Sequence, residues 1–354
     1  MEKNLFVIQL PANGSIYHKG FLDPGVRSVD IPQTNLSMPR FCVGPSTEYL
    51  WWYQQRDELS ANRGPWHTSK DVLSAVGERE LEWLQKFGCE RYPREALYRE
   101  FYGHQRVDPQ VHIGYLLDYL KLAPHVVPRK YFCFRFGELT GIIDWEHATI
   151  LPLFLQAKIP KHFQNDGDDE SENFRPPKLR SNFDMLSDGE REYELEIYRR
   201  RQVHYFYVGF TDRHNKPHFN AMRKHNIVMR NRLYDTACRP WEGDNASLQA
   251  ELISTLEQWE ELAPEVVAPV QYSMEETKNC LARHAKQKEA DLQMEQIRAF
   301  IGVNIEGWVP NGTFEEAKAK AEYIKNEMLN EVETEYERRE LLEHWPFQDH
   351  EEID

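Results

Sequence analysis

The chain has 354 residues, of which 40% are hydrophobic, and a formal net charge of −15. This length allows a sizeable core, as one large domain or two small ones, whereas the acidic balance argues against nucleic acid as a partner, because a phosphate backbone requires clustered Lys and Arg. Five scattered cysteines without a Cys-x-x-Cys pair fit a reducing compartment and argue against a disulfide framework or a zinc site, and no apolar run is long enough to span a membrane.

Residues 1–66 are predicted to form an irregular segment, because Pro, Gly, Asn and Ser are frequent there and aromatic residues are interspersed among them. The first residues contain neither the apolar core of a secretory signal nor the Arg-rich, acid-poor helix of a mitochondrial presequence. We therefore expect no targeting segment in this chain and, from these residues alone, a cytoplasmic location.

Two helices are predicted next, within a helical core that spans residues 67–262. Ser69–Phe87 carries apolar residues at helical spacing and is followed by Gly88, which is typical of a helix end. Asp108-Pro109 is typical of a helix start, and the apolar spacing continues as far as Pro124.

Residues 131–144 are predicted to form a β-hairpin around a Gly-Glu turn, because apolar and aromatic residues alternate before it and the strand pattern resumes after it. The second strand would deliver Asp144 at its C-terminal end, directly before Trp145. A carboxylate in this position is suited to holding Mg²⁺ on a nucleotide, and Asp144 is the single candidate metal ligand. A buried Asp that caps a helix after a strand is the alternative.

The rest of the chain is predicted to be mostly helical. Capping boxes, in which Ser or Thr is followed three residues later by Glu, begin helices at Ser187, Ser273 and Thr313. The helix from Ser187 is expected to be a central core helix. Two further helices, Ser273–Phe300 and Thr313–Leu342, are expected to pack as a long acidic pair within residues 263–354.

The C-terminal part is strongly acidic, with 14 Asp and Glu against 5 Lys and Arg from Thr313 to the end. Such a surface permits a basic partner, although a solvated helix face is the simpler interpretation. His214 and His218 have the spacing of a zinc site on a helix, but Pro217 would disrupt the helix there and no third ligand is suggested. Surface or hydrogen-bonded histidines are therefore the preferred interpretation.

Gly141-Ile142-Ile143-Asp144-Trp145 resembles the metal-binding motif of the aminoglycoside phosphotransferase group, which has the protein-kinase-like fold. Further segments resemble the fungal branch of this group that is named for altered inheritance of mitochondria. They are Phe41–Pro45, Arg63–Trp66, Ile150–Phe154, Ile159–Asn165, Tyr198–Gln202, His204–Tyr207, Pro240–Asp244 and Glu343–Phe347. Together these segments extend the resemblance over nearly the whole chain.

The resemblance implies an α+β fold that is predominantly α, namely the C-terminal lobe of a kinase-like protein with a small β-hairpin and without the N-terminal lobe. Residues 1–354 would then form a single kinase-like region. It also implies ATP-dependent phosphoryl transfer to a hydroxyl group of a small molecule, with Mg-ATP as cofactor, Asp144 as metal ligand and a mitochondrial location.

The parts of such an enzyme that carry the chemistry are not found. The catalytic loop of the group, His-x-Asp-x-x-x-x-Asn, is expected shortly before Asp144, but Leu122–Glu138 contains no Asp and no Asn. Arg129 and Lys130 stand where the Asn ligand is expected and would repel Mg²⁺. Because no Gly-rich loop or phosphate-binding Lys is found upstream either, we identify no catalytic or nucleotide-binding residue and predict that this chain does not transfer phosphate.

Three hypotheses remain open. The first is an active phosphotransferase in which Asp144 holds Mg²⁺. The second is a non-catalytic, pseudokinase-type binding or scaffold protein linked to mitochondria, whose partner is a protein or a small molecule. The third is an incomplete product that lacks an upstream part and the catalytic loop, and the sequence does not separate it from the second.

Overall fold

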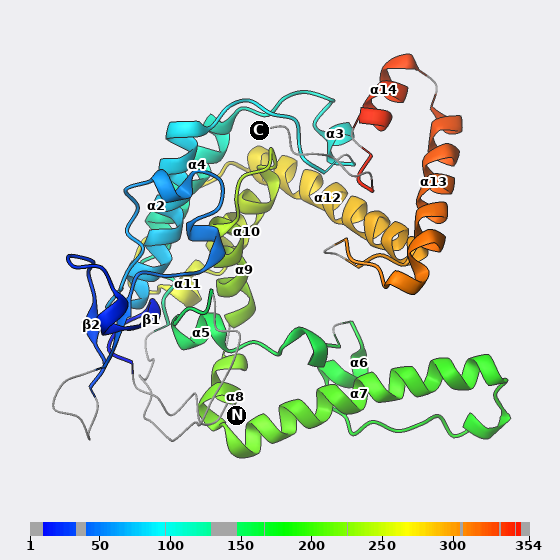
Figure 1. Ribbon diagram of the computed structural model, residues 1–354, viewed down its shortest axis with the longest axis horizontal. Coiled ribbons are helices and arrows are strands. Elements are labelled where there is room, and N and C mark those ends of the chain that lie inside the picture. The colour runs from blue at the N-terminus through cyan, green and yellow to red at the C-terminus, as the bar shows by residue number, and fades with distance from the viewer. Residues whose placement is uncertain are drawn as a thin grey trace. The chain divides into compact units, whose positions relative to one another are not determined.

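The computed structural model describes residues 10–32, 40–95, 97–128, 147–165, 167–224, 226–304, 307–332, 334–343 and 345–347. The predicted hairpin, residues 131–144, lies outside this part of the chain, and so does Asp144. The described residues form mostly helices and one small antiparallel sheet (Figure 1). This confirms a fold that is predominantly α with a minor β component.

The chain folds into two compact units that interleave along the sequence. Unit 1 comprises residues 1–79, 120–238 and 258–267, and unit 2 comprises residues 80–119, 239–257 and 268–354. The segments 1–66, 67–262 and 263–354 that the sequence suggested cut across these units. That the whole chain forms one kinase-like region stays a prediction.

Unit 1 contains a three-stranded antiparallel sheet, in the order β1-β3-β2. Its strands are β1 (Ser15–His18), β2 (Val29–Asp30) and β3 (Phe41–Gly44), and the register pairs Ser15 with Gly44. Gly14 has a φ of +146°, and a Cβ atom there would lie 2.2 Å from the carbonyl oxygen of Gly44. Only glycine fits at this close crossing. The sheet lies within the segment predicted to be irregular and was not predicted.

The other described elements of unit 1 are helical. They are η1 (Lys19–Phe21), η2 (Tyr49–Trp51), η3 (Arg56–Glu58), α5 (Leu153–Gln156), η4 (Lys161–Phe163), α6 (Asp169–Glu172), η5 (Phe183–Met185), α7 (Asp188–His214), α8 (Lys216–Met222), α9 (Ile227–Cys238) and α11 (Trp259–Leu262). Unit 1 contains small apolar cores. In one core, Ala12 and Ile31 pack with Val43 of β3, and in another, Leu153 and Ala157 pack on Ala221.

Two predicted helices are confirmed as α2 (Ser69–Phe87) and α4 (Pro109–Leu122). The side chain of Asp108 begins α4 by accepting a hydrogen bond from the backbone of Gln110 at 2.8 Å. Each of these helices extends from one unit into the other, because the unit boundaries fall after Arg79 and Tyr119.

The remaining helices belong to unit 2. They are α3 (Tyr98–Phe101), α10 (Ala246–Glu257), α12 (Met274–Ile301), η6 (Asn311–Thr313), α13 (Phe314–Glu331) and α14 (Glu335–Glu343). The capping box at Ser273 is confirmed, since Ser273 and Glu276 exchange two hydrogen bonds of 2.8 and 3.2 Å. The two long helices are in contact, because Ile301 at the end of α12 packs with Ala317 and Ala321 in the first half of α13. That they pack along their length as a pair stays a prediction.

The helix predicted from Thr313 to Leu342 is wrong in two respects. It is two helices, α13 and α14, because Thr334 and Glu337 form a separate capping box with hydrogen bonds of 3.0 and 3.2 Å. The predicted box at Thr313 does not form, since the Thr313 hydroxyl instead donates to the carbonyl oxygen of Pro310 at 3.2 Å.

The prediction that the helix from Ser187 is a central core helix is also wrong. Of the residues of α7, which spans 188–214, only Glu194, His204 and Thr211 are buried. Its apolar and aromatic residues are therefore divided between a packed face and an exposed one. The helix ends at His214, and Pro217 lies in the first turn of α8, which confirms that the two histidines do not share one continuous helix.

Candidate functional site

Among the described residues, 147–150 lie nearest in sequence to the predicted metal ligand, and we call them the post-motif segment. No group of three or more His, Cys, Asp or Glu side chains that is suited to a metal ion occurs in the described part of the chain. Because Asp144, the single predicted ligand, lies outside the described residues, no chemical step is assigned to an Mg-ATP site.

The post-motif segment is bound to the edge of the sheet in unit 1. Gly14 and Ile150 form a reciprocal backbone pair, with hydrogen bonds of 3.0 and 2.6 Å. Between these residues and the motif, the carbonyl oxygen of Ala148 accepts a hydrogen bond of 2.7 Å from the Ser15 hydroxyl and a second, of 3.4 Å, from the Thr47 hydroxyl. The backbone that follows the Asp144 motif is thus fixed by both main-chain and side-chain groups.

Four hydroxyl groups gather at this edge, and we call them the hydroxyl cluster: Ser15, Ser46, Thr47 and Thr149. The Ser15 and Thr47 oxygens are 3.0 Å apart, the Ser46 hydroxyl donates to Thr149 at 3.2 Å, and the Thr149 hydroxyl donates to the Gly14 carbonyl at 3.3 Å. Ser46 is fully buried and Ser15 nearly so. Because these hydroxyls bond to one another and to carbonyl oxygens, the cluster holds the backbone and offers no activated nucleophile.

His147 begins the post-motif segment in a left-handed backbone conformation, with a φ of +62°. Its Nδ1 atom lies 2.8 Å from the Thr47 carbonyl oxygen, and its ring meets the Tyr49 ring edge-on, with centroids 6.1 Å apart. A carbonyl oxygen only accepts, so Nδ1 carries the proton in this contact, and Nε2 becomes the acceptor of the neutral ring. A left-handed residue other than glycine is strained by about 1–2 kcal/mol, and no local pattern predicted this conformation.

Glu48 lies beside the hydroxyl cluster, and the pKa of its carboxyl group is raised. Burial raises its pKa, and the negative charge of Asp235 raises it further, against the opposing effects of Arg79 and of a hydrogen bond with Trp51. Asp235 itself pairs with Lys158, at 2.8 Å. A carboxyl group with a raised pKa is suited to general acid catalysis, but the hydroxyls beside it are committed to structural bonds. Sequence reasoning did not single out Glu48.

A second polar centre lies in unit 2 around Asp244, and it was not predicted as a site although Pro240–Asp244 carried part of the resemblance. Oδ1 of Asp244 accepts from the Tyr102 hydroxyl at 2.8 Å and from the Ala246 backbone at 2.9 Å. Oδ2 accepts from the Ser247 hydroxyl at 2.6 Å and from Gln287 at 2.8 Å. Burial raises the pKa of Asp244, but the hydrogen bonds outweigh it and hold the pKa below its usual value.

Asp244 thereby joins α10 to α12 and to the segment after α3. It caps the N-terminus of α10, receives Gln287 from α12, and accepts from Tyr102, whose ring lies 5.1 Å from the Arg283 guanidinium. His112 is buried nearby, and burial lowers its pKa to about 4, so its ring is neutral at ordinary pH. With both carboxylate oxygens engaged, Asp244 organises the unit and is not available as a base or a metal ligand.

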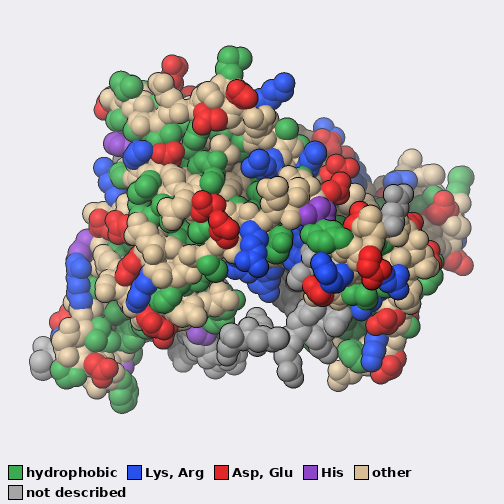
Figure 2. All heavy atoms as spheres, turned by 90° about the horizontal axis from the view of Figure 1, so that it is seen from above, with side chains coloured by type: hydrophobic (Ala, Val, Ile, Leu, Met, Phe, Trp, Pro, Cys, Tyr) green, Lys and Arg blue, Asp and Glu red, His purple; other side chains and the backbone are tan. Residues whose placement is uncertain are grey.

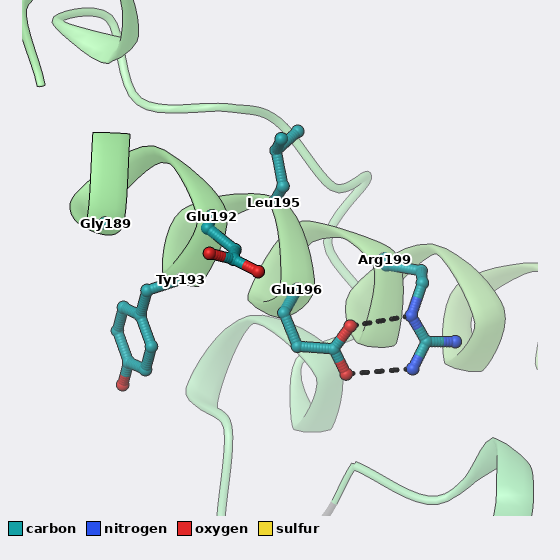
Figure 3. Close-up of a pocket in the computed structure, with 6 residues that line it drawn as sticks. All are labelled: Gly189, Glu192, Tyr193, Leu195, Glu196 and Arg199. Atoms are coloured by element: carbon teal, nitrogen blue, oxygen red, sulfur yellow. Dashed lines mark hydrogen bonds and ion pairs between the residues drawn. The ribbon is translucent and has the colours of Figure 1, made fainter. Parts of the chain in front are cut away.

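The N-terminal half of α7 carries an open surface hollow of about 590 Å³, shown in Figure 3. Its six lining residues all come from this helix, and Figure 3 shows Leu195 projecting to a different side of the helix from Tyr193. The charge of Arg199 is matched by Glu196, through hydrogen bonds of 2.8 and 2.9 Å. The hollow is therefore a solvated helix surface, without converging groups from a second element of the described chain.

Comparison with known proteins gives two similar sequences, both from Aspergillus fumigatus, one from strain CEA10 and one from strain Af293. Each is named a subtelomeric hrmA-associated cluster protein, and each is 24% identical to this chain over 399 aligned residues. The alignments cover 99% of this chain and 76% of each relative. No protein-family model and no solved structure matches the chain. The similarity to these two fungal proteins extends over the full length of the chain, at a low level of identity.

Proposed function

We propose that this chain is a non-catalytic binding protein, derived from the larger lobe of a kinase-like, aminoglycoside phosphotransferase-type fold. Two considerations argue against catalysis: the sequence lacks the His-x-Asp-x-x-x-x-Asn loop, and the polar groups of the hydroxyl cluster and of the Asp244 centre are engaged in structural bonds. The observation that carries the proposal of binding is the outward face of α7.

The opposite, packed face of α7 is held firmly within unit 1. Arg201 donates to both carboxylate oxygens of Asp168, at 2.6–3.0 Å, and both side chains are largely shielded from solvent. The Tyr207 ring stacks on Phe163, with centroids 4.8 Å apart. These contacts fix the rotation of the helix about its axis, and they determine which side chains face outward.

The outward face carries large apolar side chains without a covering element in the described chain. Leu195, Phe206 and Phe210 are 48%, 51% and 60% exposed, and at 3.6 residues per turn they fall on one stripe of the helix. The Phe206 and Phe210 rings lie one turn apart, with centroids separated by 6.3 Å. Figure 2 does not single out α7; on the face that it draws, apolar side chains lie among acidic and basic ones.

Single exposed apolar residues are ordinary, but two phenylalanines one turn apart on a long helix are typical of a helix that docks into an apolar groove. The partner that fits this face is therefore a protein with a hydrophobic groove wide enough for one helix. The family resemblance suggests a partner at mitochondria.

Phosphoryl transfer from Mg-ATP to a small-molecule hydroxyl is the second candidate. It is favoured by the resemblance around Asp144 and by the firm attachment of the post-motif segment, which begins three residues after this predicted ligand.

Two experiments test the choice between these functions. Isothermal titration of Mg-ATP into the chain and into Asp144→Ala is expected to give no saturable heat for either protein. Micromolar binding that disappears in Asp144→Ala would support the phosphotransferase and contradict our proposal.

Proximity labelling in cells tests the binding face. A labelling enzyme fused to the double variant Phe206→Gln, Phe210→Gln is expected to lose the proteins labelled by the unmodified chain. Phe21→Gln is the matched control, because Phe21 is 86% exposed and lies outside α7. An unchanged set of labelled proteins in the double variant would exclude the outward face of α7 as the binding surface.

A further inference from the structure

Unit 2 contains an apolar cavity of about 160 Å³ that is bordered by α3, α12, α13, α14 and the residues after α14. It is half open, and most of its wall is hydrocarbon, sulfur or aromatic ring. Its apolar lining includes Leu97, Met294, Ile297, Met328, Trp345 and Phe347.

The walls of the cavity belong to well-packed parts of unit 2. Phe347 and Ile297 pack against the core formed by Ile301, Ala317 and Ala321, where α13 lies on α12. Trp345 is only 3% exposed, and its ring meets Phe347 edge-on with centroids 5.5 Å apart. The cavity is therefore bounded by fixed elements on several sides and is not the space beside a loose loop.

Two charged residues of the lining, Arg99 and Glu337, are engaged with other protein groups, and the His104 ring meets the Tyr336 ring edge-on with centroids 6.1 Å apart. Arg99 donates from Nε to the Pro93 carbonyl at 3.2 Å, and its guanidinium lies 5.6 Å from the Tyr92 ring centroid. Glu337 uses its carboxylate to cap α14, accepting from the Thr334 backbone at 3.0 Å. A charged ligand would have to compete with these interactions, so the lining favours a neutral molecule.

We propose that this cavity binds a small, neutral, apolar molecule, either a single aromatic ring or a branched chain of about six carbons. The size follows from the volume, because a dry apolar cavity of about 150 Å³ in another protein accommodates benzene. The flexible thioethers of Met294 and Met328 allow the wall to adapt to ligands of slightly different shape. The site is independent of α7, which lies in unit 1.

Toluene and benzoate are the test ligands, because they share a ring and differ in charge. Toluene is expected to bind saturably in calorimetry and to raise the melting temperature, whereas benzoate at the same concentration is expected to do neither. Equal effects of the two compounds, or no saturable binding of toluene, would overturn the proposal.

Met328→Phe is designed to fill the cavity and is expected to weaken toluene binding at least tenfold. Leu292→Phe is the matched control, since Leu292 lies on α12, is 60% exposed and does not line the cavity; it is expected to bind toluene like the unmodified chain. Should Met328→Phe fail to fold, Leu97→Phe fills the same space from α3. Unchanged toluene affinity in both filled variants would contradict the proposal. So would a protein that does not bind toluene but binds an amphipathic peptide and loses that binding in Met328→Phe.

Discussion

The hydroxyl cluster of unit 1 and the Asp244 centre of unit 2 differ in the way their hydrogen bonds join separate segments of the chain. Both bury polar groups that join segments distant in sequence. The hydroxyl cluster distributes this task over four neutral side chains, each of which makes two or three ordinary hydrogen bonds. The Asp244 centre concentrates it on one carboxylate that accepts from the Tyr102 and Ser247 hydroxyls and from the Gln287 amide, besides its helix cap. Unit 2 therefore depends on a single charge in a way that unit 1 does not.

The largest expected effect is that of Asp244→Ala, which leaves Tyr102, Ser247 and Gln287 without their acceptor. Because each buried polar group without a partner costs about 1–3 kcal/mol, we expect a loss of about 4 kcal/mol in the free energy of unfolding. Urea denaturation measures it. Asp235→Asn serves as the control, because its ion pair with Lys158 is solvent-exposed and contributes at most about 1 kcal/mol. Similar losses in both variants would remove the contrast between the two centres.

The next effect is a pH dependence that originates from His112. Its pKa is lowered to about 4 in the folded chain, against about 6.5 in the unfolded chain, so the unfolded state binds more protons in this range. Stability is therefore fully present above pH 6.5 and falls as the pH decreases towards 4, by about 3 kcal/mol in total.

Unfolding experiments between pH 7 and pH 4 test this dependence, and His112→Leu is expected to flatten it. Asp244 contributes to acid sensitivity only at lower pH, because its pKa lies below the usual value. A slope that is unchanged in His112→Leu would assign the acid sensitivity to other groups.

A smaller effect is expected from each member of the hydroxyl cluster. Ser15→Ala removes one of the two donors to the Ala148 carbonyl and is expected to cost about 1 kcal/mol. Its local signature would be faster hydrogen exchange of the Ile150 amide, which donates to Gly14 beside it. Thr313→Ala, which removes an exposed hydroxyl, is the control and is expected to change stability by less than about 0.5 kcal/mol. A loss of unfolding free energy as large as that of Asp244→Ala would show that the stabilisation is not divided among the four hydroxyls.

The smallest effect has the opposite sign. Glu48 has a raised pKa, so the folded chain disfavours its charged form, and Glu48→Gln is expected to increase the melting temperature at neutral pH. The gain should disappear as the pH falls through the raised pKa, because the carboxyl group is then neutral in the unmodified chain as well. Thermal melts at neutral pH and at a pH below the raised pKa measure this gain. A lower melting temperature of Glu48→Gln at neutral pH would show that the bond to Trp51 outweighs the burial of charge.

Local signals predicted those parts of the fold in which the chain interacts with itself over a few residues. The helix α2 and the starts of α4 and α12 followed from apolar spacing, an Asp-Pro pair and a capping box, which act within one or two turns. The break between α13 and α14 had a signal of the same kind, since Thr334 and Glu337 form a capping box that was available in the sequence and was overlooked.

The parts that failed depend on contacts between distant residues. The short strands β1 and β3 have no clear alternation of their own, and their pairing rests on the fit of Gly14 against Gly44. The exposure of Phe206 and Phe210 is set by the pairing of Arg201 with Asp168, which lies 33 residues away. The Asp244 centre, likewise, needs Tyr102 and Gln287 from other segments. The single predicted ligand of the candidate site, Asp144, lies outside the described residues. No local sequence pattern predicts the raised pKa of Glu48 or the left-handed backbone of His147.

The break between α13 and α14 has a consequence for how unit 2 is assembled. The helix α14 and the Trp345–Phe347 turn contribute one side of the apolar cavity, and in the described chain they are connected to α13 through the few residues after Glu331. This side of the cavity is therefore held in place mainly by non-covalent packing and less by the covalent link to α13. Unit 2 is in this sense a two-piece object, and a synthetic peptide of residues 334–347 should be able to complete a chain that ends at residue 332.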